Sequence, residues 1–307
     1  MLFNKDNKGS MELYGLSGTF QASADYKAVE SEVLSATREV AMLVGSAVIA
    51  RAEQLYSQDS LSDADQEWLD MVRRPIAFLA ISNYARLTGL SHGETGRKIK
   101  VDDNEKVAFE WQIDRDDREM RERYFRSLDS LFNYLGDTDD YSWKESDLYK
   151  AQSATLIRSL AILEKVYPVN RSQYTYFMLV PLFLEAQETL SGIIGEERLA
   201  SLLNGADEEG ILDACRRWCV LKALILALSR WSIAAFPQEV ARQFAPSYQG
   251  NKERRAATTD EIDWTLGKLR QQLSDTESQI RNAIEDDPYA SAKLIPDNNP
   301  KKKYFTV

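Results

Sequence analysis

The sequence predicts an all-α protein made of two tandem, internally duplicated helical-bundle units, with a small β-hairpin inserted in the first. Two pairs of matching segments indicate the duplication. VLSATREVAMLVG at 33–45 aligns with FLEAQETLSGIIG at 183–195, and LDMVRR at 69–74 aligns with LDACRR at 212–217. The segments occur in the same order, each on a helical pattern, and the shorter spacing of the second pair fits a deletion in the intervening loop. Matches of this kind predict a duplicated helical unit.

Composition and charge narrow the function classes. A chain of 307 residues, 44% hydrophobic and 28% charged, is long enough for two domains of typical size, each with its own core. The first residues contain no unbroken apolar stretch, so neither a secretory signal peptide nor a membrane anchor is expected there. A net charge of -10 disfavours a large nucleic-acid surface, because phosphate binding needs a concentrated basic face. We therefore expect no sequence-specific nucleic-acid partner and no membrane partner.

Four segments are expected along the chain. An extended N-terminal arm occupies residues 1–25, because this stretch is rich in Gly, Ser, Asn and Lys and lacks periodicity. The first helical unit covers 26–137, the second covers 145–287, and an extended C-terminal tail covers 288–307. The tail contains three prolines and no periodic apolar face, so it is expected to stay extended unless it docks on a partner.

The first unit is expected to contain three main helices, whose apolar residues recur every three or four positions. The first starts at Val29 and the third runs over 112–135. The second runs from Trp68 to Leu87, and Pro75 marks a kink or a first-turn boundary. The inward-facing residues are Val33, Ala36, Val40, Val44 and Ala47 in the first helix, Leu69, Val72, Ile76, Leu79, Ala80, Tyr84 and Leu87 in the second, and Ile113, Met120, Tyr124, Leu128, Leu131 and Leu135 in the third.

The segment 97–111 carries the strand signal of the first unit. Ile99 and Val101 alternate with lysines, turn-forming residues follow, and a second alternation runs from Val107 to Trp111. This pattern predicts a β-hairpin. Because an isolated two-stranded hairpin is only marginally stable in water, we expect it to pack on the bundle or to be completed by a partner.

The second unit is expected to repeat this order of helices. The inward residues of its first helix are Leu182, Ala186, Leu190 and Ile194. The most apolar segment, 218–236, is interrupted by Lys222 and Arg230, so it predicts a buried core helix and not a membrane span. Cys215 and Cys219 lie four residues apart on one helical face, which predicts buried thiols in a reducing compartment.

The last helix is predicted to open with a capping box formed by Thr258 and Glu261. A polar, proline-containing loop at 237–255 precedes it, where the first unit has its hairpin. The apolar residues of the last helix recur in steps of four and three and form a seam of about two heptads. This seam is short for an independent coiled coil, so we expect it to pack within the bundle. Its residues are Ile262, Leu266, Leu269, Leu273, Thr276, Ile280 and Ala283.

The search for catalytic residues finds little. His92 is the only histidine, and its Gly-rich loop is typical of a solvated turn residue and not of a general base. Without it, no nucleophilic Ser or Cys can be paired with a histidine base. The segment GETGRK at 93–98 lacks the spacing of a phosphate-binding loop. Two acidic clusters could hold a cation, but solvated turns are expected in a chain with 48 acidic residues: Asp102, Asp103 and Glu105, and Asp137, Asp139 and Asp140. We therefore expect a non-enzymatic protein with no cofactor and no metal site.

Local basic clusters and nearby aromatic residues are the candidate assembly contacts. They are Arg97, Lys98, Lys100, Phe109 and Trp111 in and beside the hairpin, Lys252, Arg254 and Arg255 in the second unit, and Lys301, Lys302, Lys303, Tyr304 and Phe305 in the tail. Each basic cluster also has the plain interpretation of surface solubility. As assembly contacts, they would carry positive charge to an acidic neighbouring subunit.

Several segments resemble an uncharacterised family encoded in phages and prophages of Bacteroides and relatives. In the first unit they are RRPIAFLAISNYARL at 73–87, FEWQIDRDDRE at 109–119 and YFRSLDSLFNYL at 124–135. In the second they are LAILEKVYPVN at 160–170, FLEAQETLSGIIGEERLASLL at 183–203 and FPQEVARQF at 236–244. The resemblance covers most of residues 13–285, and its motifs are packing patterns.

More distantly, the order of helices and loops is similar to the head-to-tail connector, or adaptor, proteins of tailed phages. That resemblance implies a structural component of a phage particle, located in the virion or, before assembly, in the cytoplasm of the bacterial host. Its partners would be the portal, the tail or neighbouring copies of the chain in a ring. If the ring forms only on the particle, the free protein is monomeric. Connector proteins commonly have a single unit, so the duplication leaves the ring stoichiometry open.

A second interpretation remains open. A cytoplasmic helical module could bind a small molecule or a peptide between its two halves. Neighbouring portal, capsid and tail genes would favour the particle component, whereas an isolated gene or metabolic neighbours would favour the binding module. An enzyme is the third possibility, and turnover that is lost on substituting one polar pocket residue would favour it.

Overall fold

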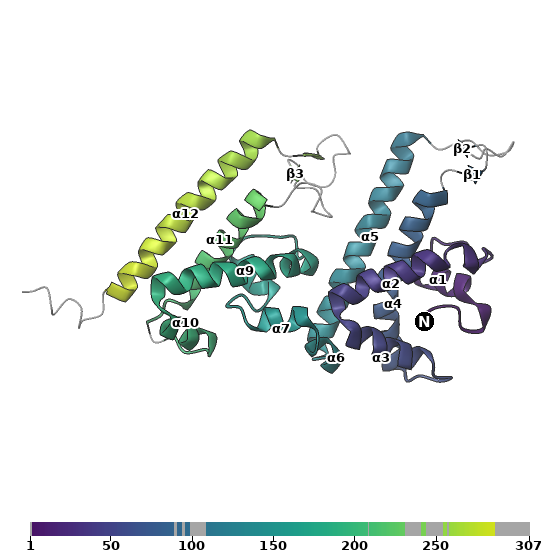
Figure 1. Ribbon diagram of the computed structural model, residues 1–307, viewed down its shortest axis with the longest axis horizontal. Coiled ribbons are helices and arrows are strands. Elements are labelled where there is room, and N and C mark those ends of the chain that lie inside the picture. Colours follow the sequence, from purple (N-terminus) through teal and green to yellow (C-terminus); the bar gives the residue numbers. More distant parts are fainter. Residues whose placement is uncertain are drawn as a thin grey trace, which may run out of the picture. The chain divides into compact units, whose positions relative to one another are not determined.

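The computed structural model describes residues 2–88, 91–93, 96–98, 109–207, 209–230, 241–243, 254–256 and 258–285 (Figure 1). The described chain is helical apart from two short strand pairs, so the predicted all-α class is confirmed. It divides into two compact units. Unit 1 comprises Met1–Lys150 and Ser172–Phe177, and unit 2 comprises Ala151–Arg171 and Met178–Val307.

The elements follow one another along the chain with short connections. Up to Ser153 they are η1 (Lys5–Asn7), α1 (Gly9–Ser17), η2 (Tyr26–Ala28), α2 (Glu30–Val44), α3 (Ser46–Tyr56), α4 (Asp63–Thr88), β1 (Ser91–Gly93), β2 (Gly96–Lys98), α5 (Glu110–Asp137), α6 (Tyr141–Lys144) and α7 (Asp147–Ser153). After it come α8 (Leu160–Val166), α9 (Gln173–Ile194), α10 (Glu196–Leu203), α11 (Leu212–Arg230), β3 (Ala241–Gln243), β4 (Arg254–Ala256) and α12 (Thr259–Glu285).

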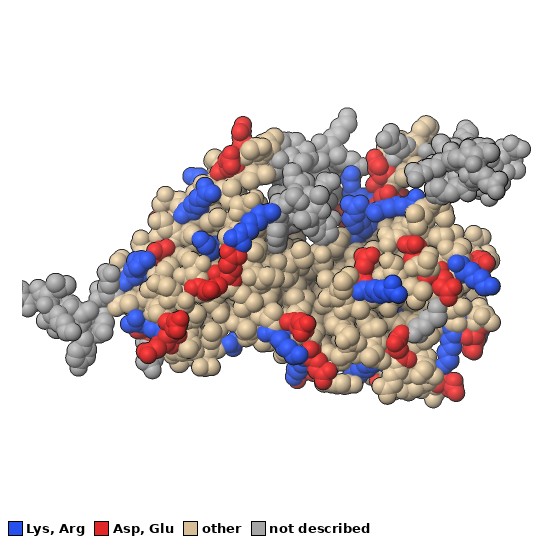
Figure 2. Space-filling view, viewed as in Figure 1, with Lys and Arg blue, Asp and Glu red and all other residues tan. Residues whose placement is uncertain are grey.

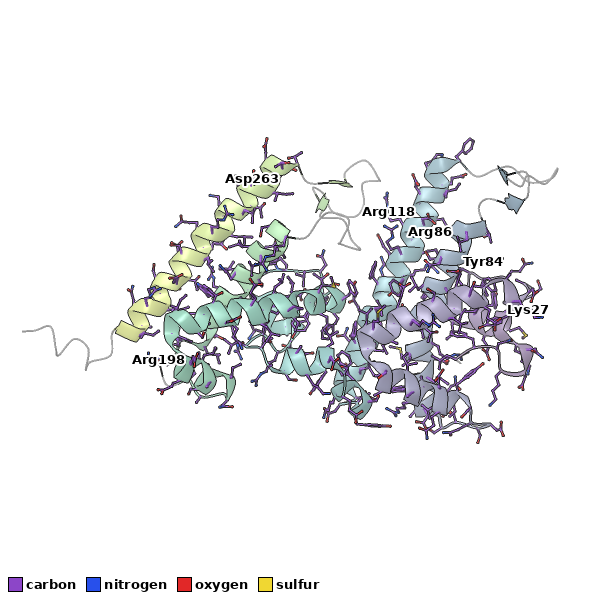
Figure 3. The ribbon with its side chains drawn as sticks, viewed as in Figure 1. Lys27, Tyr84, Arg86, Arg118, Arg198 and Asp263 are labelled. Carbon is purple, nitrogen blue, oxygen red and sulfur yellow. The ribbon has the colours of Figure 1, made fainter. Side chains whose placement is uncertain are left out.

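In unit 1, α4 is the central helix and packs against α1, α2, α3 and α5. Four residues of the predicted first stripe are buried in α2: Val33, Ala36, Val40 and Val44. The fifth, Ala47, is half-buried and lies in α3, because the chain turns at Gly45. Pro75 lies inside α4, which continues from Asp63 to Thr88. The ends of the predicted stripes are exposed, as for Leu87 and Ile113. On the α4–α5 pair, Arg86 (labelled in Figure 3) lies 3.5 Å from Asp117 through its Nε atom.

The prediction of an extended arm at 1–25 is wrong. This segment contains α1, which packs on α4, and Leu2, Phe3 and Leu13 are buried. Apolar burial is one cause, and the second is a buried guanidinium. Arg73 of α4 donates its Nε hydrogen to the carbonyl oxygen of Leu2 at 2.9 Å. Because the segment is mostly polar, its sequence did not predict these buried contacts.

The hairpin prediction is corrected in part. Strand β2 pairs antiparallel with β1, with Arg97 opposite His92, so the observed pairing begins before the predicted segment 97–111. Residues 99–108, which hold most of the predicted strands, lie outside the described part of the chain. Trp111 was expected in a strand but lies in α5, because Phe109 already serves as the N-cap of that helix.

In unit 2, α11 packs against α8 and α12. The predicted buried thiols are confirmed, since Cys215 and Cys219 are both free and buried. The capping box is also confirmed, with the Thr258 backbone amide donating to Glu261 at 3.0 Å. Along the predicted seam of α12, the buried residues are Leu266, Leu269, Thr276 and Ile280. This seam therefore packs within the unit, as expected.

The helix α9 carries residues of both units, with Tyr176 and Phe177 in unit 1 and the rest of its buried face in unit 2. Among the described helices, α9 alone is long and apolar enough to cross a membrane by length and composition. Of its apolar window, 44% is buried inside the protein, which also fits a core helix.

A glycine with an unusual backbone separates two consecutive helices in each unit. Gly45, between α2 and α3, has φ 91° and ψ 154°. Gly195, between α9 and α10, has φ 87° and ψ 151°. This region of backbone space is essentially restricted to glycine. Both positions therefore end one helix and turn the chain into the next in nearly the same way.

Candidate functional site

The carboxylate of Asp140 is the centre of a polar cluster in unit 1. It is the N-cap of α6, and its Oδ1 atom accepts hydrogen bonds from the backbone amides of Ser142 at 2.9 Å and Trp143 at 3.0 Å. The Ser142 hydroxyl donates to the same oxygen at 2.5 Å. The other oxygen, Oδ2, accepts the Trp68 indole hydrogen at 2.8 Å and a guanidinium hydrogen of Arg51. Asp140 thus joins α3, α4 and α6.

The guanidinium of Arg51 lies against two aromatic rings. Its central carbon is 4.2 Å from the centroid of the Trp68 ring and 5.1 Å from that of Tyr141. Cation–π attraction and the ion pair with Asp140 both fix the position of this side chain. The cluster therefore presents a neutralised arginine whose stem and head cannot move freely.

A pocket of about 300 Å³ opens beside this cluster. We call it the Asp140 pocket. Its lining residues are Arg51, Ala64, Asp65, Trp68, Tyr134, Thr138, Asp139, Asp140 and Tyr141. Asp139 forms an exposed ion pair with Lys144 at 2.6 Å, and Asp65 accepts a hydrogen bond from the Ser62 hydroxyl at 2.7 Å.

The surroundings of Asp140 favour its ionised form. Burial raises the pKa of Asp140, but the hydrogen bonds from Ser142, Trp143 and Trp68, together with Arg51, outweigh it, so the pKa is lowered. Burial and then the charge of Glu67 raise the pKa of the Tyr134 phenol, which therefore stays neutral. The pocket thus combines aromatic rings with an excess of negative charge.

A second buried network anchors the N-terminal segment of unit 1. Arg73 donates to Glu12 at 2.8 Å, and its guanidinium lies 4.7 Å from the centroid of the Phe3 ring. The Tyr56 hydroxyl donates to Glu12 at 2.8 Å and accepts the Lys5 amide hydrogen at 2.6 Å. These groups satisfy one another, so the network is structural and leaves no open site.

The residues predicted as assembly contacts fall into three groups. Phe109 and Trp111 are 68% and 60% exposed on the first turn of α5. Arg97 and Lys98 lie in β2, and Arg254 and Arg255 lie in β4. Lys100, Lys252, Lys301, Lys302, Lys303, Tyr304 and Phe305 lie outside the described residues. On the face drawn in Figure 2, the described acidic and basic side chains are interspersed.

The prediction of solvated turns is wrong for Asp140, which is 5% exposed. Sequence reasoning also missed Arg51, Trp68 and Tyr141 as partners. The available signal was local, namely an aspartate followed by Ser142 and Trp143 at N-cap spacing. Among the described residues, no group of three or more His, Cys, Asp or Glu could hold a metal ion.

Comparison with known proteins adds one match, which includes the whole cluster. Residues 41–153 match a family of unknown function, DUF6712. The matched range begins within α2, ends at the last residue of α7 and contains Arg51, Trp68, Asp140 and Tyr141. It covers less than half of the chain. No curated protein and no solved structure matches the sequence.

Proposed function

We propose that the chain is a tandem duplication of one helical unit and serves as a non-enzymatic structural protein of a phage or prophage particle, at the head-to-tail neck. The observation that carries the proposal is the correspondence between the two halves, element by element. Each half runs through a short helix, two helices separated by the unusual glycine, a further long helix, a short antiparallel strand pair and a final long helix.

Burial follows the same correspondence. At a spacing of 150 residues, each buried position of α2 meets a buried position of α9, although α9 buries further residues. At a spacing of 143, most buried positions of α4 meet a buried position in or next to α11. The coinciding pairs are Val33 with Phe183, Ala36 with Ala186, Val40 with Leu190, Val44 with Ile194, Trp68 with Ile211, Val72 with Cys215, Ile76 with Cys219 and Ala80 with Ala223. The coincidence of buried positions over two helices in each half supports a common origin.

The arginines of the matching LDMVRR and LDACRR segments make the same kind of contact. Arg73 donates its Nε hydrogen to the carbonyl of Leu2 at 2.9 Å, and Arg216 donates its Nε hydrogen to the carbonyl of Leu156 at 3.2 Å. In both cases the accepting residue and the next one, Phe3 or Ile157, are buried ahead of a short helix. This similarity extends the proposed repeat to the N-terminal segment.

The long helices α5 and α12 also begin alike. The backbone amide of Phe109 donates to the Gln112 side chain at 2.9 Å, and that of Thr258 donates to Glu261 at 3.0 Å. At the same spacing of 149 residues, α5 buries Ser127 and α12 buries Thr276. These details support a repeat that reaches the last described helix.

A duplicated unit suits assembly, because one chain then offers two similar surfaces to a symmetric partner. A ring of six such chains would present twelve similar units, and it closes if the rotation between neighbours is correct. The particle assignment rests on the resemblance of 73–87 and 109–119 to a phage-encoded family, and the neck location on the more distant likeness to connector proteins. The exposed Phe109 and Trp111 at the start of α5 support a contact surface at that end of the helix.

Mass spectrometry of density-purified particles from an induced lysogen tests this proposal. We expect the chain at constant stoichiometry with the portal, and heads that fail to join tails when the gene is deleted. A complementing copy should restore infectious particles, which controls for effects on neighbouring genes. Absence of the chain from particles, together with normal infectivity of the deletion strain, would contradict the proposal. The alternative, a module that binds a small molecule or a peptide, predicts this absence and this normal infectivity.

A further inference from the structure

The Asp140 pocket carries an excess of negative charge that no residue lining it neutralises. Asp140 and Arg51 cancel each other within a buried ion pair. Asp65 and Asp139 remain, and Asp139 pairs with Lys144 through side chains that are 78% and 40% exposed. Exposed pairs of this kind are weak and exchange readily. The pocket is therefore prepared to accept a cationic group.

The aromatic walls add a second requirement to the ligand. Trp68 is buried and one of its faces is occupied by Arg51, whereas Tyr141 is 64% exposed. Tyr134 also lines the pocket. Ring faces attract ammonium and guanidinium groups and also stack with other rings. A segment with lysines followed by aromatic residues thus matches both the carboxylates and the rings.

We propose that the Asp140 pocket binds the segment Lys301–Phe305 of a second copy of this chain. That segment reads KKKYF, three lysines next to two aromatic residues. Fifteen residues separate it from Glu285, the last residue of α12, and they can extend over about 50 Å. This reach is sufficient for the segment to enter a neighbouring molecule. The inference rests on the proposed assembly function and names the contact that joins copies.

The geometry of such a contact is head-to-tail. The pocket and the lysine segment are different surfaces, so each copy offers one of each and the interface is heterologous. Copies joined in this way form a ring or an open chain. Charge attraction should also make the contact sensitive to ionic strength.

A complementation experiment with full-length variants tests the proposal. The pocket variant carries Asp65→Asn and Asp139→Asn, which leave the Arg51–Asp140 pair in place. The segment variant carries Lys301→Ala, Lys302→Ala and Lys303→Ala. The matched control carries Asp59→Asn and Asp213→Asn, which remove the same charge from side chains that are 103% and 96% exposed and lie outside the pocket. Self-association is measured by analytical ultracentrifugation at high protein concentration and low salt.

The expected result is specific. Wild type and the control associate beyond dimers, each variant alone stays at the 35.0 kDa monomer mass, and an equal mixture of the two variants forms heterodimers only. A labelled peptide of residues 298–307 should bind the segment variant, and its affinity should fall at least tenfold when the pocket substitutions are added. Association that survives in the pocket variant, or peptide binding that the pocket substitutions leave unchanged, would overturn the proposal. So would a peptide that does not bind.

The outcome is separable from that of the proposed function. If the chain is found in particles but its pocket variant still assembles, the particle role stands and this contact is refuted. If the chain is absent from particles but the peptide binds the pocket, the contact stands and the particle role is refuted.

Discussion

Replacing Gly195 by alanine should destabilise the protein, whereas replacing Gly192, on the preceding turn of the same helix, should stabilise it. Gly195 has φ 87° and ψ 151°, a conformation that an alanine adopts only at a cost of about 1–3 kcal/mol. Nothing lies within 4 Å of a Cβ atom at either position, so no steric term enters. At Gly192, inside α9, alanine should gain about 0.5–1 kcal/mol from its lower backbone entropy in the unfolded chain.

The same substitution at Gly45 should have a larger effect. Its φ and ψ match those of Gly195, so the conformational cost should be equal. A Cβ atom there would also lie 2.8 Å from the Cβ of Ser146, closer than such atoms pack. Overpacking of this kind adds about 1–3 kcal/mol.

Urea denaturation followed by far-UV circular dichroism gives the free energies of unfolding. We expect the order of stability Gly192→Ala, wild type, Gly195→Ala and Gly45→Ala, from highest to lowest. A Gly195→Ala variant as stable as Gly192→Ala would refute the claim that this glycine is required by its backbone conformation. Equal losses at Gly45 and Gly195 would refute the steric contribution of Ser146.

Four further perturbations have defined outcomes. Asp140→Asn should lower the free energy of unfolding by about 2–4 kcal/mol, because the NH2 group of the amide would face the donor groups of Trp68 or Arg51. The exposed neighbour Asp139 is the control, and Asp139→Asn should change the free energy of unfolding by under about 0.5 kcal/mol. Folding lowers the pKa of Asp140, so the stability that its carboxylate contributes is present above the unfolded pKa and is lost as the pH falls through the folded pKa, below about 4. The urea midpoints of wild type and of Asp140→Asn should converge in that pH range. Cys215 and Cys219 should not react with a thiol reagent in the native protein at pH 8, because both are buried and burial raises the pKa of Cys215 to about 12. Both should react in urea, and fast labelling of the native protein would contradict their burial. Truncation after Glu285 should leave the melting temperature nearly unchanged and weaken partner binding, whereas a large thermal loss would place the tail in the core.

Periodicity carried most of the fold prediction. The spacing of Val33, Ala36, Val40 and Val44 is a local property, and a helix with one apolar face has few alternatives, so its burial followed from the sequence. The N-terminal segment did not follow, because Leu2 and Phe3 are too few to show a period. Their burial depends on Arg73, which lies 71 residues away from Leu2. Long-range anchors of this kind leave no local pattern.

The candidate site was hidden for the same reason. Asp140 was identified in the sequence as part of an acidic cluster, and composition favoured a solvated turn. Its burial depends on Trp68 and Arg51, which lie 72 and 89 residues away. The cluster exists only once α3, α4 and α6 have packed together. Only the N-cap spacing of Asp140, Ser142 and Trp143 could have suggested it.

Averaged images of the particle neck test the central proposal most directly. If the chain is a duplicated connector protein, density for both units should appear in one ring, with six copies contributing twelve similar units. The two units of each copy should superpose with one helix order and handedness. The overlay should run from the segment bound by Arg73 to α5 in unit 1, and from the segment bound by Arg216 to α12 in unit 2. Twelve copies would contradict the sixfold arrangement, and absence of the chain from the neck would contradict the connector assignment.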